Sequence, residues 1–284
     1  MNLPGCVSQV VEDALGSPVT SAAAVGGGCI NQTLRIDTRD GRCFVKWNPR
    51  APAGFFESES HGLQRLRGTD TVRVPEVLAQ AIDGSGAAMA LAWIDESPAS
   101  PRAMEDAGRR LALLHRQRGH SPGLDRPGWI GTLEQDNEIG TDGSWLSFFR
   151  ERRLEPLASA LPTAARRDLD KLDLHRYLEE PEGGCCLLHG DLWAGNLVTD
   201  RQGRGWVVDP AIYCGHPEMD LAMTRLFGGF SPAFYGAYQD VHGAFDEGLD
   251  DRLELWNLYP LLVHAHLFGG GYGSQVASIV GRYA

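Results

Sequence analysis

Residues 187–209 read L-L-H-G-D-L-W-A-G-N-L-V-T-D-R-Q-G-R-G-W-V-V-D and place three oxygen-bearing side chains at a fixed spacing. Asp191 lies five residues before Asn196, and Asp209 ends a short apolar run. In kinases, a catalytic-loop Asp, a metal-binding Asn and a metal-binding Asp follow one another in this order. The stretch therefore predicts a phosphoryl-transfer enzyme, and a kinase of a small molecule in particular.

Length and charge narrow the class of protein. The chain has 284 residues, which suits a two-lobed unit, and carries 26 Lys and Arg against 37 Asp and Glu, a net charge of −11. This charge repels nucleic acid and anionic membranes, so we expect neither as a partner. No apolar stretch approaches the roughly 20 residues of a membrane helix, and residues 1–8 lack a secretory pattern, so a cytoplasmic location is expected.

The first third of the chain predicts a small antiparallel sheet with two helices. Apolar periodicity favours helices, alternation favours strands, and Arg39-Asp40-Gly41 is a hairpin turn. The expected helices cover residues 7–16 and 55–66, and the expected strands cover 19–25, 33–37, 42–47, 77–82 and 87–94.

The rest of the chain predicts mainly helices. Residues 95–101, D-E-S-P-A-S-P, are rich in helix breakers, so we place a boundary there, with an N-terminal lobe of residues 1–94 and a C-terminal lobe of residues 95–284. Residues 119–143 are rich in Gly, Pro, Asn and Asp and predict a long functional loop. Helices are expected over residues 104–117, 145–154, 161–178, 219–227, 234–245 and 253–268.

Further residues supply the other parts that phosphoryl transfer needs. Lys46, on the third strand, can pair with the α- and β-phosphates of a nucleotide, and Glu59 on the next helix can hold its ammonium. The glycines Gly26, Gly27 and Gly28 permit close approach of backbone to phosphates. Asp191 would accept the substrate proton, and Asn196 and Asp209 offer hard oxygen ligands that suit Mg²⁺.

Each part has an alternative interpretation when taken alone. A triple-glycine turn is more often a hairpin loop, and a strand Lys is more often a solvated edge charge. An Asp such as Asp191 readily caps a helix, and His189 can be a hydrogen-bonded core residue. The set as a whole, in the order that one mechanism requires, favours the kinase interpretation.

Two blocks of sequence resemble a known family. H-G-D-L-W-A-G-N at 189–196 and D-P-A-I-Y-C-G-H-P-E-M-D-L-A-M-T-R-L-F-G-G-F at 209–230 are similar to the fructosamine kinases, or ketosamine-3-kinases. These belong to the protein-kinase-like superfamily with the aminoglycoside and choline phosphotransferases. The resemblance implies an α+β, bilobal protein-kinase-like fold with a small antiparallel-sheet N-lobe and a mainly helical C-lobe. Shorter matches lie at residues 26–30, 44–46, 111–116 and 145–154.

The resemblance also implies a reaction and a substrate. Such a kinase uses ATP and Mg²⁺ to phosphorylate the sugar 3-hydroxyl of a ketosamine, a fructosamine or ribulosamine formed on a protein lysine or on a small amine, which promotes deglycation. Trp193 would then line the acceptor site, where its ring can stack on a sugar; the alternative is a core tryptophan. His216, Glu218 and Asp220 are expected to have structural roles, shaping a loop and capping the helix near Met219.

Two features depart from the family pattern. The adenine is expected against the connector Leu91, Ala92, Trp93 and Ile94, but Ala92 stands where relatives often carry Glu, so hydrogen bonds must come from backbone. Cys29 follows the glycines and is unusual beside phosphates; as a hypothesis, it is an oxidisable redox switch that links two copies in a homodimer. The alternative for Cys29 is a buried small hydrophobe.

Three other functions remain open from the sequence. The acceptor could be another hydroxyl, such as that of an aminoglycoside, choline or an amino alcohol. The chain could also be a noncatalytic nucleotide-binding pseudokinase, or a regulatory protein that keeps only the fold. The Lys, Glu, Asp, Asn and Asp set argues against the noncatalytic nucleotide-binding protein.

Overall fold

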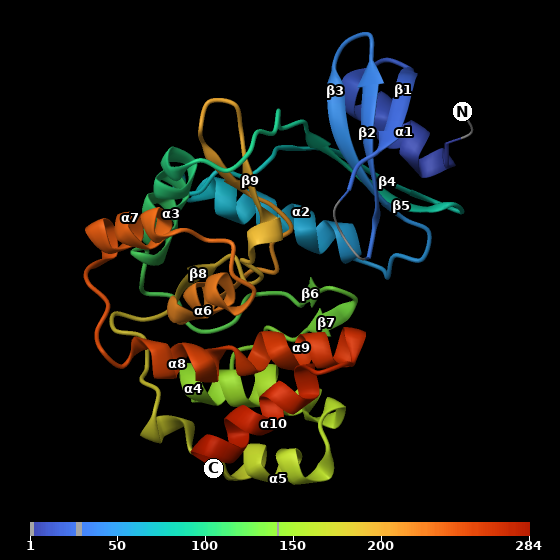
Figure 1. Cartoon of the computed structure of the whole chain (residues 1–284). Helices are drawn as coiled ribbons and strands as arrows, with labels where there is room; N and C mark the ends of the chain where they lie inside the picture. Colours follow the sequence, from blue (N-terminus) through green and yellow to red (C-terminus); the bar gives the residue numbers. More distant parts are fainter. Residues whose placement is uncertain (1–2, 27–29, 141) are drawn as a thin grey trace.

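A five-stranded antiparallel sheet forms the upper lobe of the protein (Figure 1). The computed structural model describes residues 3–26, 30–140 and 142–284. The strands lie in the order β1-β2-β3-β5-β4, which places β3, the strand that carries Lys46, in the centre. Their bounds are β1 Val19–Ala24, β2 Gln32–Thr38, β3 Arg42–Asn48, β4 Val77–Asp83 and β5 Gly86–Ala92.

Each face of this sheet is covered by one helix. Helix α1 (Gly5–Leu15) packs Val7, Val10 and Val11 against one face, where they share a buried cluster with Val45 of β3. Helix α2 (Phe55–Gly68) lies on the other side, between the sheet and the lower lobe (Figure 1). Because successive side chains of a strand alternate between faces, Lys46 is on the α2 side.

The predictions for this lobe are confirmed with small shifts of boundary. Both expected helices and all five expected strands are present, and Gly16 ends α1 in the left-handed conformation, with φ 66°. Strand β5 ends at Ala92, two residues before the predicted end.

The lower lobe is mainly helical, as the sequence predicts. Its longest helix, α3 (Pro101–His115), begins three residues before the expected start because the Ser100 hydroxyl accepts a hydrogen bond from Ala103 N at 3.2 Å and caps it. Helix α3 packs closely against α7. The other helices are α4 Trp145–Phe148, α5 Thr163–Lys171, α6 Glu218–Leu226, α7 Pro232–His242, α8 Leu249–Trp256, α9 Leu258–Phe268 and α10 Tyr272–Tyr283, and α4 continues as a π-helix over Phe149–Leu154 and a 3₁₀ helix over Glu155–Ala160.

Two predicted helices of this lobe are wrong in extent. The helix expected over 161–178 ends at Lys171, because Leu172 is extended and the Asp173 side chain instead caps a short 3₁₀ turn, Leu174–Arg176. The helix expected over 253–268 is two helices, α8 and α9, joined at Asn257. Helix α10, which follows three glycines at 269–271, was not predicted at all.

The predicted loop 119–143 contains a hairpin, β6 (Gly128–Ile130) paired with β7 (Leu133–Gln135), which corrects the loop assignment. Trp129 of β6 contacts Phe55 of α2, with ring centroids 5.8 Å apart, so the hairpin joins the two lobes (Figure 1). The buried guanidinium of Arg153 anchors the segment that follows, donating to Asp136 O and Asn137 Oδ1, each at 2.6 Å.

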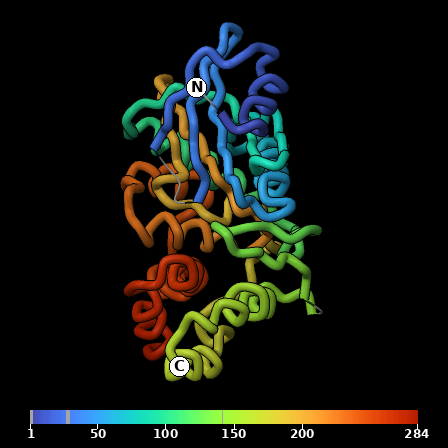
Figure 2. Tube along the Cα trace, turned by 90° about the vertical axis from the view of Figure 1, so that its right-hand side faces the viewer, coloured from blue at the N-terminus to red at the C-terminus, as the bar shows by residue number. Residues whose placement is uncertain are grey.

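The last helices pack beside the first helices of the same lobe. Helix α10 contacts both α9 and α5, and in Figure 2 the red C-terminal helices lie next to the yellow-green segment that contains α4 and α5. None of the helices in the part of the chain that the structure describes is long and apolar enough to span a bilayer.

Candidate active site

Two short antiparallel ladders hold the segments that carry the predicted catalytic residues. Strand β8 (Cys186–Leu188) pairs with β11 (Tyr213–Gly215), and β9 (Leu197–Thr199) pairs with β10 (Gly205–Val207). The segment 189–196 therefore connects β8 to β9, and the segment 208–212 connects β10 to β11. Backbone hydrogen bonds from Val208 N to Asn196 O, 3.0 Å, and from Ala211 N to His189 O, 2.9 Å, join the two segments.

The first segment brings Asp191 and Asn196 into direct contact. The Asn196 amide nitrogen donates to the backbone oxygen of Asp191 at 2.8 Å and to its carboxylate Oδ2 at 3.2 Å. This pair of bonds fixes the amide, so Asn196 Oδ1 points the other way and accepts no hydrogen bond from any residue that the structure describes. The oxygen is free to bind a cation.

Asp209 reaches across to the upper lobe. Lys46 Nζ lies 2.6 Å from Asp209 Oδ1 and 2.5 Å from Glu59 Oε1. Lys46 is only 3% exposed, which rules out a solvated edge charge. Burial alone would lower the pKa of Lys46, but the charges of Asp209 and Glu59 outweigh burial and raise that pKa above its usual value. The structure thus brings the Lys, Glu and Asp of the predicted set together between the lobes.

The backbone of Asp209 has an uncommon conformation for a residue with a side chain. Its φ is 56°, in the left-handed region, where Asp is among the side chains that occur most often. Its second carboxylate oxygen has no hydrogen-bond partner within residues 3–26, 30–140 and 142–284. Together with Asn196 Oδ1, it offers the hard oxygen ligands that Mg²⁺ prefers, so the residues present fit the predicted metal.

Asp191 has the electrostatics of a proton acceptor. Burial, and next the charge of Asp209, raise the pKa of Asp191 to about 7, although the hydrogen bond from Asn196 opposes the rise. A carboxyl group with a pKa near the working pH is suited to general-base catalysis. The structure places no helix behind Asp191 for it to cap, because Ala194–Asn196 form only a short 3₁₀ turn.

A buried carboxylate, Asp220, holds the backbone of this segment, which is a structural role as expected, although Asp220 shapes the loop before Asp191 and does not cap α6. Asp220 Oδ2 accepts a hydrogen bond from His189 N at 2.8 Å, and Oδ1 accepts one from Gly190 N at 2.9 Å. His115 Nε2 also lies 3.2 Å from Oδ2, and Tyr238 OH lies 2.9 Å from His115 Nδ1. Asp220 thus positions the residues that immediately precede Asp191.

The sequence analysis did not identify the hydrogen bonds of Asp220 to the backbone before Asp191, although the position of Asp220 in the sequence indicates a buried charge. Asp220 lies in α6 between Met219 and Leu221, and both of those side chains are buried. A charged residue at a buried position of a helix requires hydrogen-bond partners, and the sequence offered none nearby.

The histidine and the glycine before Asp191 are fixed by their surroundings. His189 is a buried, hydrogen-bonded residue, as one interpretation of the sequence held: Nε2 donates to Val208 O at 2.9 Å, and Nδ1 accepts from Asp191 N at 3.3 Å. Gly190 has a φ of 82°, and a Cβ at this position would lie 2.0 Å from Ala211 O, so only glycine fits here.

His216 and Glu218 have the structural roles expected of them. His216 Nδ1 accepts a hydrogen bond from Glu218 N at 3.2 Å at the start of α6, and its ring stacks on Trp256, with centroids 5.2 Å apart. The Glu218 carboxylate accepts hydrogen bonds from Arg252 Nη2 at 2.6 Å and from Trp256 Nε1 at 2.8 Å, which ties α6 to α8.

The residues predicted to contact the adenine lie at the end of β5 and just after it. Leu91 is on the same face of the sheet as Lys46, because Lys46 pairs with Met89 and Leu91 is two residues further along β5. The N–H of Ala92 donates to Glu76 O at 2.8 Å, so this group is already occupied. Trp93 and Ile94 follow β5 and are partly exposed.

The predicted glycine loop lies mostly beyond the described residues. Gly26 is exposed, and a Cβ added to it would have no neighbour within 4 Å, so packing does not require glycine there. Gly27, Gly28 and Cys29, including the proposed redox role of Cys29, fall outside the residues that the structure describes.

Trp193 is on the surface, so the alternative of a core tryptophan is wrong. It is 41% exposed and lies two residues after Asp191. Its ring packs against the backbone of Gly195: a Cβ at Gly195 would lie 2.2 Å from Trp193 Cη2. The ring is thus held beside residues 189–196, the candidate catalytic segment, with part of its surface open to solvent.

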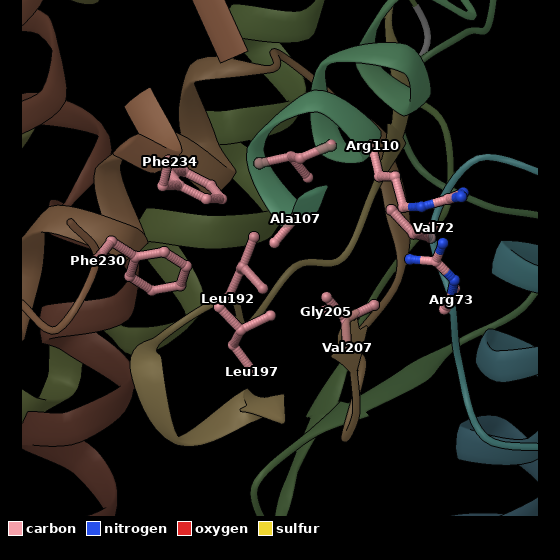
Figure 3. A pocket seen from close by; sticks show the side chains of 11 residues that line it. Val72, Arg73, Ala107, Arg110, Leu192, Leu197, Gly205, Val207, Phe230 and Phe234 are labelled. Atoms are coloured by element: carbon pink, nitrogen blue, oxygen red, sulfur yellow. The ribbon is translucent and has the colours of Figure 1, made fainter. Parts of the chain in front are cut away.

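A small cavity lies behind the catalytic segment (Figure 3). Its volume is about 10 Å³, enough for roughly one water molecule and far too small for a nucleotide. Leu192 and Leu197, which flank the Asp191 and Asn196 pair, point into it, with Arg73 and Arg110 at one side (Figure 3). The other lining residues are Val72, Ala107, Leu111, Gly205, Val207, Phe230 and Phe234.

Comparison with known sequences identifies one family. The family model described as fructosamine kinase matches residues 5–284. A "probable ketoamine kinase" of Enterococcus faecium is 38% identical over 267 residues, covering 91% of this chain and 94% of the relative. A chloroplastic protein-ribulosamine 3-kinase of Arabidopsis thaliana is 33% identical, covering 96% of this chain and 86% of the relative.

Comparison with solved structures identifies proteins of the same fold. The crystal structure of a Thermobifida fusca protein assigned as a fructosamine-3-kinase is 33% identical, with a TM-score of 0.83 and 98% of each chain covered. The aminoglycoside phosphotransferase APH(4)-Ia, solved with AMP-PNP and hygromycin B, is similar in fold alone, with 16% identity, a TM-score of 0.64 and 99% of each chain covered. The bilobal protein-kinase-like fold predicted from the sequence is therefore confirmed.

Proposed function

The chain belongs to the fructosamine kinase family, and from that membership we propose that it transfers the γ-phosphoryl group of ATP to a sugar hydroxyl of a ketosamine. The observation that carries the proposal is the meeting of Lys46 from the upper lobe with Asp209 from the lower lobe, next to the Asp191 and Asn196 pair. These groups supply a cation for phosphates, metal ligands and a base, which are the parts that phosphoryl transfer requires.

In this mechanism Asp191 accepts the proton of the acceptor hydroxyl. Its pKa of about 7 favours this role near neutral pH. The hydroxyl oxygen forms a bond to the γ-phosphorus while the bond between that phosphorus and the β–γ bridging oxygen breaks, and ADP leaves. Lys46 stabilises phosphate charge, and Glu59 holds the Lys46 ammonium in place.

Asn196 and Asp209 would hold Mg²⁺, which supplies neutralisation of polyphosphate charge when it is bound. Asp209 Oδ1 is paired with Lys46, while its other oxygen and Asn196 Oδ1 remain available. This donor set supports the metal assignment, because both side chains present oxygen and neither presents nitrogen or sulfur to the site.

The nucleotide would lie against β5 and the connector that follows it. Leu91 offers an apolar surface on the Lys46 side of the sheet, and backbone groups of Trp93 and Ile94 would bond the adenine, since the Ala92 N–H is already occupied. Gly26, with the two glycines after it, would cover the phosphates. We also propose that the boundary between the lobes lies between residues 94 and 95, ahead of α3.

The acceptor is a ketosamine, a fructosamine or ribulosamine on a small amine or on a protein lysine, and the 3-hydroxyl receives the phosphoryl group. Trp193, exposed beside Asp191, would stack on the sugar ring. The names of the relatives, ketoamine kinase and protein-ribulosamine 3-kinase, support this acceptor class.

ATP consumption with a panel of acceptors tests the proposal. The panel consists of fructosylated and ribosylated lysine derivatives, an aminoglycoside and choline, each with ATP and Mg²⁺. We expect turnover with the ketosamines and phosphate on the sugar 3-oxygen in the NMR spectrum of the product. Turnover only with the aminoglycoside or choline would assign another acceptor, and no turnover with any acceptor would favour a noncatalytic nucleotide-binding protein.

A further inference from the structure

A row of aromatic side chains leads away from the catalytic segment across the surface of the lower lobe. It begins at Trp193 and continues through Phe227, His264 and Phe268, with Tyr272 beside His264; we call these five residues the aromatic row. Successive ring centroids are 6.4 Å apart for Trp193 and Phe227, 4.8 Å for Phe227 and His264, and 5.6 Å for His264 and Phe268. The Tyr272 ring lies 5.1 Å from the His264 ring.

The row gathers three exposed aromatic side chains on one surface. Trp193, Phe227 and Phe268 are 41%, 40% and 51% exposed. In the described parts of the chain the other large hydrophobic side chains with comparable exposure are aliphatic and lie outside the row: Ile82, Leu113 and Ile139. A contiguous exposed apolar surface beside a catalytic site is typical of a ligand-binding surface.

Phe227 and Phe268 both belong to a repeated tetrapeptide that ends a helix. The tetrapeptide Leu-Phe-Gly-Gly occurs at 226–229 and again at 267–270, at the ends of α6 and α9. Glycines with positive φ, such as Gly228 at 68° and Gly269 at 65°, follow the Phe each time and end the helix. Each helix therefore leaves a Phe at its C-terminal end.

The row is attached to the catalytic segment itself. A Cβ at Gly229 would lie 2.4 Å from the Ala194 side chain, so the turn after Phe227 packs directly on the residue that follows Trp193. The row is therefore a continuation of the acceptor side of the site, and it is longer than the single sugar ring that Trp193 can cover.

The electrostatics of the row favour a cationic ligand. Aromatic faces attract ammonium groups, and the C-terminal end of α6, beside Phe227, contributes partial negative charge at the start of the row. His264 donates from Nδ1 to Pro260 O at 2.7 Å, and burial lowers its pKa, which disfavours the charged form of the ring. The row contains neither Lys nor Arg, and Arg225, close by in sequence, is paired with Asp250.

We propose that the aromatic row binds the amine-bearing arm of the acceptor, a long aliphatic chain with a protonated nitrogen such as the side chain of a glycated lysine, while the sugar lies at Trp193 and Asp191. This inference rests on the proposed function and adds to it a preference for lysine adducts over adducts of short amines. The protonated nitrogen of a ketosamine is bonded to the sugar, so it would lie at the start of the row and its methylene chain would extend towards Phe268.

The test compares two acceptors with the same sugar. One is the ketosamine on Nε of Nα-acetyl-lysine methylamide, and the other is the ketosamine of methylamine, which ends near Trp193. We expect kcat/KM of the wild type to be higher for the lysine adduct. Phe227→Ala and Phe268→Ala should each lower the ratio of the two kcat/KM values about three- to tenfold by removing apolar contact with the lysine methylene chain, whereas Phe268→Trp should keep it.

Ile82→Ala is the matched control, because it removes an exposed apolar side chain of the upper lobe, and it should leave the ratio unchanged. An unchanged ratio in both Phe variants would overturn the inference while the proposed function stood. No turnover of either ketosamine by the wild type would overturn the proposed function itself. If light scattering shows a wild-type dimer that Phe268→Ala separates without changing the ratio, the row is a contact between copies of the chain and the inference is wrong.

Discussion

Lys46 Nζ lies 2.6 Å from Asp209 Oδ1 although 163 residues separate the two in sequence. One residue belongs to the central strand of the sheet, and the other follows β10 in the helical lobe. Their ion pair therefore connects the lobes directly, next to the contact between Asp191 and Asn196. The same carboxylate that binds Lys46 is the one we assign to the metal.

The first prediction separates the roles of the two aspartates. Asp191→Asn should lower kcat by a factor of about 10² to 10⁴ through loss of the base, with binding of Mg²⁺ and ATP retained. Asp209→Asn should weaken nucleotide binding as well, because it removes a charged metal ligand and a partner of Lys46. Steady-state kinetics and calorimetric titration measure both effects. Asp240→Asn, at an exposed position of α7, is the control, and wild-type turnover in Asp191→Asn would refute the assignment.

The second prediction concerns Asp220 as a positioning residue. Asp220→Asn replaces one acceptor oxygen by an amide nitrogen, which cannot accept the hydrogen bonds from both His189 N and Gly190 N. We expect kcat to fall roughly 10- to 100-fold with KM for ATP near the wild-type value, since a displaced base loses orientation without affecting the nucleotide.

Hydrogen exchange supplies a readout for Asp220 that a general loss of stability would not give. The amides of His189 and Gly190 should exchange faster in Asp220→Asn, while amides of β3 in the other lobe should not change. Tyr238→Phe, which removes only the hydroxyl bonded to His115, should have a smaller effect on kcat. Uniform acceleration of exchange across both lobes would argue against a local positioning role.

The third prediction uses the cavity behind the catalytic segment. Leu192→Ala removes a side chain that is 1% exposed and enlarges a space that already exists, so it should lower the free energy of unfolding by about 2–5 kcal/mol. Urea denaturation measures this change. Leu113→Ala at a 41% exposed position of α3 should change stability by no more than about 0.5 kcal/mol. Equal losses in the two variants would show that Leu192 does not pack as described.

The fourth prediction concerns the contribution of three buried histidines to the pH dependence of stability. Burial lowers the pKa of His216 to about 4, and burial also lowers the pKa values of His115 and His189 below their usual value. A histidine whose pKa is lower in the folded state takes up a proton more readily when unfolded, so its contribution is complete above about pH 6.5 and is lost as pH falls. Each of these histidines should therefore lower the free energy of unfolding as pH falls from about 6.5 towards 4, whereas Asp191, whose pKa is raised to about 7, acts in the opposite direction over this range.

A single substitution isolates one histidine of this set. His216→Gln should make the decrease between pH 6.5 and pH 4 shallower, by up to about 3 kcal/mol, because about 1.4 kcal/mol corresponds to each unit of pKa shift. Denaturant titrations at a series of pH values measure the slope. A slope identical to that of the wild type would show that His216 does not contribute.

What the sequence determined by itself was local. The spacing from Asp191 to Asn196 predicts that both belong to one phosphoryl-transfer site, and the structure adds the hydrogen bond between them. Strand alternation placed Lys46 on β3, and the order of motifs assigned Asp209 to the same site. Periodicity, spacing and the order of motifs are properties of the sequence itself, so they can be recognised without knowledge of the fold.

Only the tertiary structure decided which distant groups meet. Asp220 lies 30 residues from Gly190, and nothing in its helix indicates that its carboxylate holds the Gly190 amide. The hairpin β6 and β7 was hidden in a segment rich in turn residues, because its stability comes from Trp129 against Phe55 and from other contacts outside the segment. The aromatic row likewise draws residues from three regions of the chain. Burial and pairing across such separations depend on how the whole chain packs, so local patterns cannot specify them.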